Sequence, residues 1–190
     1  MDIGTIVAIA LGALALVYGV VVYNSLVGLK HAVSQAWSNI DVLLKQRHDE
    51  LPKLVETCRQ YMKHERETLE QVMRARAAVA SAREAHDVGG LGQAEGMLRL
   101  GLGNLFALAE AYPDLKANES FRHLQGRITA LENSIADRRE FYNASVNVNN
   151  VRIDQFPDMM VARLFGFKHA NLLEFAPAEV ADVNLKALFQ

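Results

Sequence analysis

The sequence has few of the residues on which several specialised protein classes depend. Its 190 residues include one cysteine, four prolines and 12 glycines, and only 7% of them are aromatic. A single cysteine excludes an internal disulfide framework and a zinc site built from cysteines. The low Gly and Pro content, with no repeat of either residue, excludes collagen-like and low-complexity chains. With 51% hydrophobic residues, the chain is also too apolar for a disordered polymer.

An excess of charge of one sign is also missing. The 20 Lys and Arg residues are balanced by 22 Asp and Glu residues, which gives a net charge of −2. No broad basic field is present to attract nucleic acid, so we expect no nucleic-acid partner. The Arg-rich stretch at 66–83 is interleaved with glutamates, which is typical of a solvated, salt-bridged helix face.

One long apolar run separates the amino-terminal end from the rest of the chain. Residues 3–22 carry no charge, and only Thr5 and Tyr18 have polar side-chain groups. A helix of this length covers the ~30 Å hydrocarbon core of a bilayer, so we expect a membrane span that contacts lipid. Small residues four positions apart also offer a face for self-association of two spans. The residues that define the span and this face are Ile3, Gly4, Ala8, Gly12, Ala15, Gly19 and Val22.

Two other interpretations of the apolar run fit the sequence less well. A cleaved secretory signal has a basic amino-terminal region, yet no Lys or Arg precedes Lys30. A buried core helix is rarely apolar on every side. The basic residues Lys30, Lys45 and Arg47 all follow the run. Because Lys and Arg prefer the cytoplasmic side, the expected topology is single-pass, with the N-terminus outside and residues 24–190 in the cytoplasm.

The rest of the chain shows helical periodicity without a strand pattern. Apolar residues repeat every three or four positions in segments near 24–63, 65–86, 91–112 and 118–155, and a shorter helix is expected at 159–167. We also expect a turn at 87–90, an N-cap at Asn118 and a helix stop before Pro157. Pro52 is expected to kink or briefly break the first helix. The predicted fold is all-α: the membrane helix (residues 1–23) continues into an up-and-down four-helix bundle (residues 24–168) with coiled-coil-like seams and long first and last helices. A C-terminal tail follows at 169–190, and the sequence leaves open whether it packs.

Polar residues interrupt the apolar seams of the first and last long helices. If these helices are antiparallel, Asp41 is expected to face Arg138 or Arg139, and Arg47 is expected to lie near Glu132 or Asn133. A buried arginine requires a charged or hydrogen-bonding partner. Asp41, Arg47, Arg138 and Arg139 therefore form a candidate buried polar layer. This layer sets the register of the helices or lines a groove that binds a partner. The further alternative is that the seam drifts and these residues are simply exposed.

No constellation for catalysis, metal binding or cofactor binding is found. His64-Glu65 begins like a zinc motif, but Thr68 stands where its second histidine is required. Cys58 lies on an apolar seam, which favours a buried thiol over a nucleophile. We therefore expect no catalytic residue, no metal and no cofactor.

Several segments along the chain resemble one family when they are taken together and in order. They are Tyr23–Val27, Trp37–Arg47, Leu51–Glu56, His64-Glu65, Glu110–Asn118, Phe121, Leu124-Gln125, Tyr142-Asn143 and Phe156-Pro157. This series resembles the bacterial LemA family over nearly the whole chain. The resemblance implies a single anchor in the bacterial inner membrane, a mostly cytoplasmic four-helix bundle and no established activity. One departure is Val148-Asn149, where the family tends to have Tyr-Asn.

These observations predict a membrane-anchored scaffold or interaction protein without catalytic activity. A homo-oligomer and a separate, unidentified membrane protein are the two partner classes left open. The alternative is an enzyme, or an enzyme accessory, that acts at the membrane through a polar groove near Asp41, Arg47 and Arg138. A third class is a membrane-shaping scaffold built from many copies.

Overall fold

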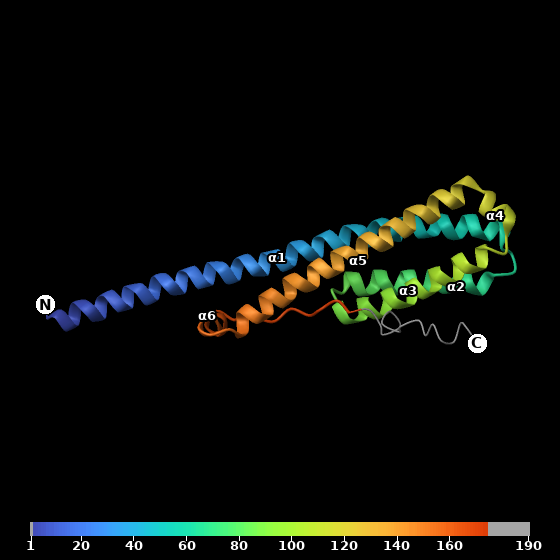
Figure 1. The fold of residues 1–190 in the computed structure, drawn as a ribbon. Helices are drawn as coiled ribbons and strands as arrows, with labels where there is room; N and C mark the ends of the chain where they lie inside the picture. Colours follow the sequence, from blue (N-terminus) through green and yellow to red (C-terminus); the bar gives the residue numbers. More distant parts are fainter. Residues whose placement is uncertain (1, 175–190) are drawn as a thin grey trace, which may run out of the picture. The chain divides into compact units, whose positions relative to one another are not determined.

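A computed structural model describes residues 2–174, and these residues form six α-helices with no strand among them (Figure 1). The all-α prediction is confirmed in this part of the chain. The prediction of four main helices and one short helix is incomplete, because an additional short helix follows α3. In chain order, the helices are α1 (Ile3–Tyr61), α2 (Arg66–Glu84), α3 (Val88–Ala109), α4 (Pro113–Ala117), α5 (Glu119–Asp154) and α6 (Asp158–Leu164).

Helix α1 is 59 residues long and is continuous from the apolar run through Pro52. Between residues 3 and 22, only Gly19 and Val22 are shielded from solvent. This exposure contradicts a core helix, whose apolar side chains would be covered by protein. Among the described residues, α1 is the one helix long and apolar enough to cross a membrane. The expected break at Pro52 is not present.

The described residues divide into two compact units. Unit 1 contains residues 2–40 and 137–172, and unit 2 contains residues 41–136 and 173–174. Unit 1 therefore includes the apolar run, the second part of α5 and all of α6. Unit 2 includes α2, α3 and α4 with parts of the two long helices.

In unit 2, α2 and α3 run side by side and contact each other along their lengths (Figure 1). Gly101 of α3 lies against Val72 of α2, where a Cβ on residue 101 would be 3.4 Å from Val72 Cγ2. Gly92 permits an even closer approach, since a Cβ there would collide with the carbonyl oxygen of Glu174. Glycine is therefore required for packing at position 92, whereas a Cβ at position 101 would make an ordinary contact with Val72.

In unit 1, the segment after α6 lies along α5 and is held there by hydrogen bonds. The Asn150 side chain donates to the Ala170 carbonyl and accepts from the Ala170 N–H, both at 2.9 Å. The Tyr142 hydroxyl donates to the Asn171 carbonyl at 2.9 Å, and its ring packs against Trp37. Residues 170 and 171 of the predicted tail are therefore held against α5, and 175–190 lie outside the described residues.

Helix ends follow local signals in the sequence. Asn118 caps α5 as predicted, because its side-chain oxygen accepts from the Phe121 N–H at 3.0 Å. Helix α5 ends at Asp154, close to the expected stop before Pro157. The expected turn at 87–90 was wrong in part, because Asp87 caps α3 by accepting from the Gly90 N–H, so that α3 begins at Val88. Residues 113–117, which lie between two of the expected helices, form α4 with Pro113 in its first turn.

Candidate functional site

The most buried charges of unit 2 meet at Arg47. Its guanidinium donates through Nη2 to Glu95 Oε1 of α3 and through Nη1 to Glu132 Oε1 of α5. The Arg47 side chain is 1% exposed, Glu95 is 3% exposed and Glu132 is 23% exposed. One arginine from α1 therefore joins two carboxylates from two other helices inside the protein.

The electrostatic surroundings keep Arg47 charged. Burial on its own would lower the pKa of Arg47, because the interior disfavours the cation. The charges of Glu95 and Glu132, and their hydrogen bonds to the guanidinium, outweigh burial and raise the pKa of Arg47 above its ordinary value. The cluster is an ion-paired polar layer with its cation closed to solvent, which suits a structural role better than a binding groove.

The four residues predicted for the polar layer differ in their burial and in their partners. Arg47 is buried beside Glu132, and this prediction is confirmed. Asp41 is partly exposed and forms an ion pair with Arg83 of α2 at 3.6 Å. Arg138 is exposed and Arg139 is partly buried. The prediction of a buried Asp41 and a buried Arg138 was therefore wrong.

The error at Arg138 comes from the period of the helix. Strict alternation of three- and four-residue steps after Ile135 gives Arg138, Tyr142, Ser145 and Asn149. Of these four, Tyr142 and Asn149 are buried, and the other buried positions in this part of α5 are Val146 and Ile153. An α-helix has 3.6 residues per turn, so a strict 3.5-residue repeat drifts across its face, and an extra four-residue step restores the seam.

The sequence did not identify Glu95 as a member of the layer. A usable signal was present, because Glu95 falls between Leu91 and Leu98 at the four- and three-residue spacing of the buried seam of α3. A carboxylate at such a position requires a cation from a neighbouring helix. Only the packing of the helices shows that this cation is Arg47.

A second polar cluster explains why α1 continues through Pro52. Proline has no N–H, so the carbonyl of His48, four residues earlier, loses its helical partner. Arg76 of α2 replaces that partner, since its Nε donates to the His48 carbonyl oxygen at 2.9 Å. The Arg76 Nη2 also contacts His48 Nε2 at 2.6 Å. An arginine from another helix thus satisfies the carbonyl that Pro52 leaves open.

We expect Arg76→Ala to destabilise unit 2 by about 1.5–3 kcal/mol, because it removes a charged donor from a partly buried carbonyl. In a Pro52→Ala background the loss should be smaller, since the N–H of the introduced alanine then bonds the same carbonyl. Hydrogen exchange of α1 and α2 peptides would measure the difference. The four chains to compare are the parent, Arg76→Ala, Pro52→Ala and the double variant. Equal losses in both backgrounds would show that Arg76 does not compensate for Pro52.

His48 should make the stability of unit 2 depend on pH. Burial and the adjacent Arg76 guanidinium lower the pKa of His48 below its ordinary value of 6.5. Arginine only donates, so its contact with Nε2 requires the neutral imidazole. The unfolded chain therefore takes up a proton near pH 6.5 while the folded chain does not. Stability is full above this pH and falls as the pH decreases toward the lowered pKa.

His48→Gln should remove that part of the pH dependence, because glutamine offers an acceptor that does not titrate. Denaturant unfolding of the parent chain and of His48→Gln at pH 7.5 and pH 5 gives the change in the free energy of unfolding with pH for each chain. Groups elsewhere titrate in the same way in both chains, so their contributions cancel in the comparison. The same decrease in stability in both chains would contradict the assignment.

The remaining candidates for chemistry have structural roles. Cys58 is fully buried, and burial raises the pKa of its thiol to about 12, so the reactive thiolate is suppressed. Within residues 2–174, no three His, Cys, Asp or Glu side chains are grouped in a way that could hold a metal ion.

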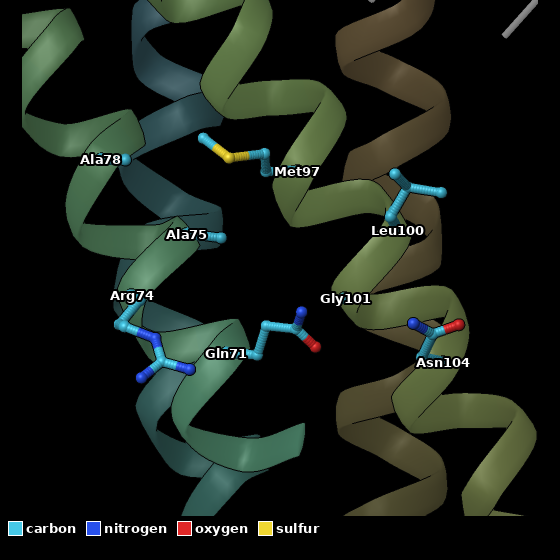
Figure 2. A pocket seen from close by; sticks show the side chains of 8 residues that line it. All are labelled: Gln71, Arg74, Ala75, Ala78, Met97, Leu100, Gly101 and Asn104. Atoms are coloured by element: carbon cyan, nitrogen blue, oxygen red, sulfur yellow. The ribbon is translucent and has the colours of Figure 1, made fainter. Parts of the chain in front are cut away.

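A groove of about 580 Å³ lies between α2 and α3 in unit 2. Figure 2 shows Gln71 of α2 and Met97 of α3 pointing into the space between the two helices. Small residues line its walls, and Met97 and Leu100 are largely exposed. This groove is mostly apolar, and neither Arg47 nor its partners Glu95 and Glu132 line it. The residues that line it are Gln71, Arg74, Ala75, Ala78, Met97, Leu100, Gly101 and Asn104.

Comparison with protein families identifies the family of this chain. The model of the LemA family matches residues 36–186, which is most of the chain. The chain belongs to the LemA family. The family match and the exposed apolar helix of this LemA-family protein together indicate that it is membrane-associated.

Curated relatives of this LemA-family protein include magnetosome proteins. MamQ 1 and MamQ 2 of Paramagnetospirillum magneticum are each 34% identical to it over 107 residues, which is 55% of this chain and 39% of those proteins. MamQ of Magnetospirillum gryphiswaldense is 31% identical over 106 residues, which is 54% of this chain and 39% of that protein. The match therefore spans about two fifths of the length of these relatives.

Proposed function

We propose that this LemA-family protein is a noncatalytic scaffold that is anchored in a membrane by residues 3–22 and presents its cytoplasmic helices to a protein partner. The observation that carries the proposal is the continuity of α1. The same helix contains the exposed apolar run and, with no break, the buried seam of the folded part. Such a helix connects the bilayer to the folded part without a flexible linker.

The polar residues of the described chain support a structural interpretation. Arg47 is closed off by Glu95 and Glu132, and Arg76 is engaged with His48. These groups stabilise the packing of the helices. The alternative, an enzyme or enzyme accessory, required an open polar groove at Asp41, Arg47 and Arg138, and the burial of Arg47 does not favour it.

The groove between α2 and α3 is the candidate contact surface. Exposed Met97 and Leu100 offer apolar area, and the small side chains of Ala75 and Ala78 leave room for a partner helix. Methionine adapts its shape to different partners, so it suits an interaction surface. We propose that an apolar helix of a protein partner occupies this groove, and a second copy of the chain is the first partner to test.

Light scattering on a sizing column in mild detergent tests self-assembly of the full-length chain. We would compare the parent chain with Leu100→Arg in the groove and Gly12→Leu in the span. A lower mass for Leu100→Arg supports assembly through the groove, and a lower mass for Gly12→Leu supports assembly through the span. A monomeric parent chain would contradict self-assembly, and a separate partner protein would then be sought with Leu100→Arg as the negative control.

A further inference from the structure

Helix α6 packs against the end of the apolar run of α1. Val22 and Leu26 of α1 form one buried cluster with Ile153 of α5 and Ala162 of α6. The Tyr18 hydroxyl lies 3.5 Å from Asp158 Oδ1, at the start of α6. Tyr18 is one helical turn, about 6 Å, before Val22. Helix α6 is therefore level with the last turn of the membrane span.

The outer side of this region is unusually apolar. Phe156, Met160 and Leu164 follow one another at four-residue intervals, and Phe165 comes directly after α6. Their exposed fractions are 73%, 63%, 79% and 58%. We call these four residues the α6 patch. Four large apolar side chains beside the end of a span match the boundary between headgroups and acyl chains, where such side chains are buried by lipid.

Charges around the α6 patch fit an anionic membrane surface. Lys30, Arg163 and Lys168 are exposed in the same unit. The two acidic residues nearby are already engaged, because Asp158 pairs with Arg152 at 2.5 Å and Asp154 contacts His169 at 3.1 Å.

A cavity of about 680 Å³ lies next to the α6 patch. Its lining includes Lys30, His31 and Lys168, together with Tyr23, Phe165 and Phe167. The Tyr23 ring packs against both phenylalanine rings, at centroid distances of 4.8 Å and 5.8 Å. Aromatic rings beside basic groups are typical of the interfacial region of a bilayer.

We propose that α6 and the turn after it are a second membrane contact, in which the α6 patch enters the headgroup region and Lys30, Arg163 and Lys168 engage anionic phospholipids. This proposal depends on the membrane anchor proposed above. It gives α6 a role of its own, since a second contact fixes the depth and tilt at which the folded part leaves the bilayer.

Fluorescence quenching in lipid vesicles tests the contact with the full-length chain. The dye NBD would be attached to Leu164→Cys, and lipids spin-labelled near the headgroup would act as quenchers. The control is Ser38→Cys, an exposed position of α1 in the same unit and about 24 Å beyond Val22 along the helix. Cys58 should stay unlabelled because it is fully buried, and the parent chain checks this.

We expect quenching several-fold stronger at Leu164→Cys than at Ser38→Cys, in vesicles that contain phosphatidylglycerol. Quenching at residue 164 should be stronger in anionic than in neutral vesicles. Replacing Arg163 and Lys168 by glutamine should reduce the ratio of the two by up to about fivefold for each charge removed. Equal quenching at the two positions would overturn the proposal. Energy transfer between copies at residue 164, without quenching by lipid, would also overturn it and assign the α6 patch to a protein interface.

A third label at Val7→Cys separates failure of this contact from failure of the anchor. Val7 lies in the exposed apolar run and should be quenched by lipids labelled deep in their acyl chains. Quenching at Val7→Cys without quenching at Leu164→Cys overturns only the α6 contact. Absence of both overturns the anchor and the contact together.

Discussion

Replacement of Arg47 by methionine is expected to lower the free energy of unfolding of unit 2 by about 3–5 kcal/mol. The reason is that the negative charges of two carboxylates remain inside the protein. Glu95 is almost fully buried and Glu132 is mostly buried, so both lose their guanidinium partner in a region where water cannot replace it. Hydrogen exchange of peptides from α2 and α3 would report the loss within unit 2. Arg122→Met, an exposed arginine of α5 in the same unit, is the matched control.

A triple variant separates the charge effect from packing. Arg47→Met together with Glu95→Met and Glu132→Met replaces the ion cluster by apolar side chains of comparable length. Such replacements are often neutral or stabilising, because the desolvation of the charges disappears along with their attraction. The triple variant should therefore recover most of the stability that Arg47→Met loses. If it is as unstable as the single variant, the loss comes from packing around Arg47 and not from the carboxylates that lost the Arg47 guanidinium.

Charges placed in the middle of the apolar run should release the protein from the membrane. One arginine at the centre of a membrane helix is unfavourable by about 2.5–3.5 kcal/mol. Leu11→Arg with Leu14→Arg places two of them near the centre of residues 3–22, where both native side chains are exposed. We expect this double variant to move from the carbonate-resistant membrane fraction to the soluble fraction.

The matched control is Val148→Arg with Val151→Arg. These two valines of α5 are also exposed and have the same three-residue spacing, but they lie outside the apolar run. This variant should stay with the membrane. Retention of the Leu11→Arg/Leu14→Arg chain in the carbonate-resistant fraction would argue that residues 3–22 do not provide the anchor.

Features set by neighbouring residues were predicted well from the sequence. The uncharged run at 3–22 has the length of a span because hydrocarbon thickness and helix rise are constants. The cap at Asn118 and the end of α5 before Pro157 depend on a few adjacent residues. The family was also recognisable, because its motifs lie in order along the chain.

Partners far apart in the sequence were predicted less well. The pairing of Arg47 with Glu132 followed from the assumed antiparallel helices, but Glu95 was missed because nothing in the sequence aligns α3 with α1. The burial of Arg138 was wrong because a 3.5-residue repeat was extended along a helix that has 3.6 residues per turn. Of the kink or brief break expected at Pro52, the break was wrong, because the donor that satisfies the His48 carbonyl comes from Arg76, 28 residues later.

By itself, the sequence determined that this protein is helical, that it has one run suited to a bilayer and that it belongs to the LemA family, because each of these depends on local pattern or on motif order. Only the tertiary structure decided which charges are buried together, how α1 tolerates Pro52, and that α6 packs beside Tyr18 and Val22. The physical reason is that periodicity gives the face of a helix. The element that covers this face is selected by packing and by the pairing of buried polar groups.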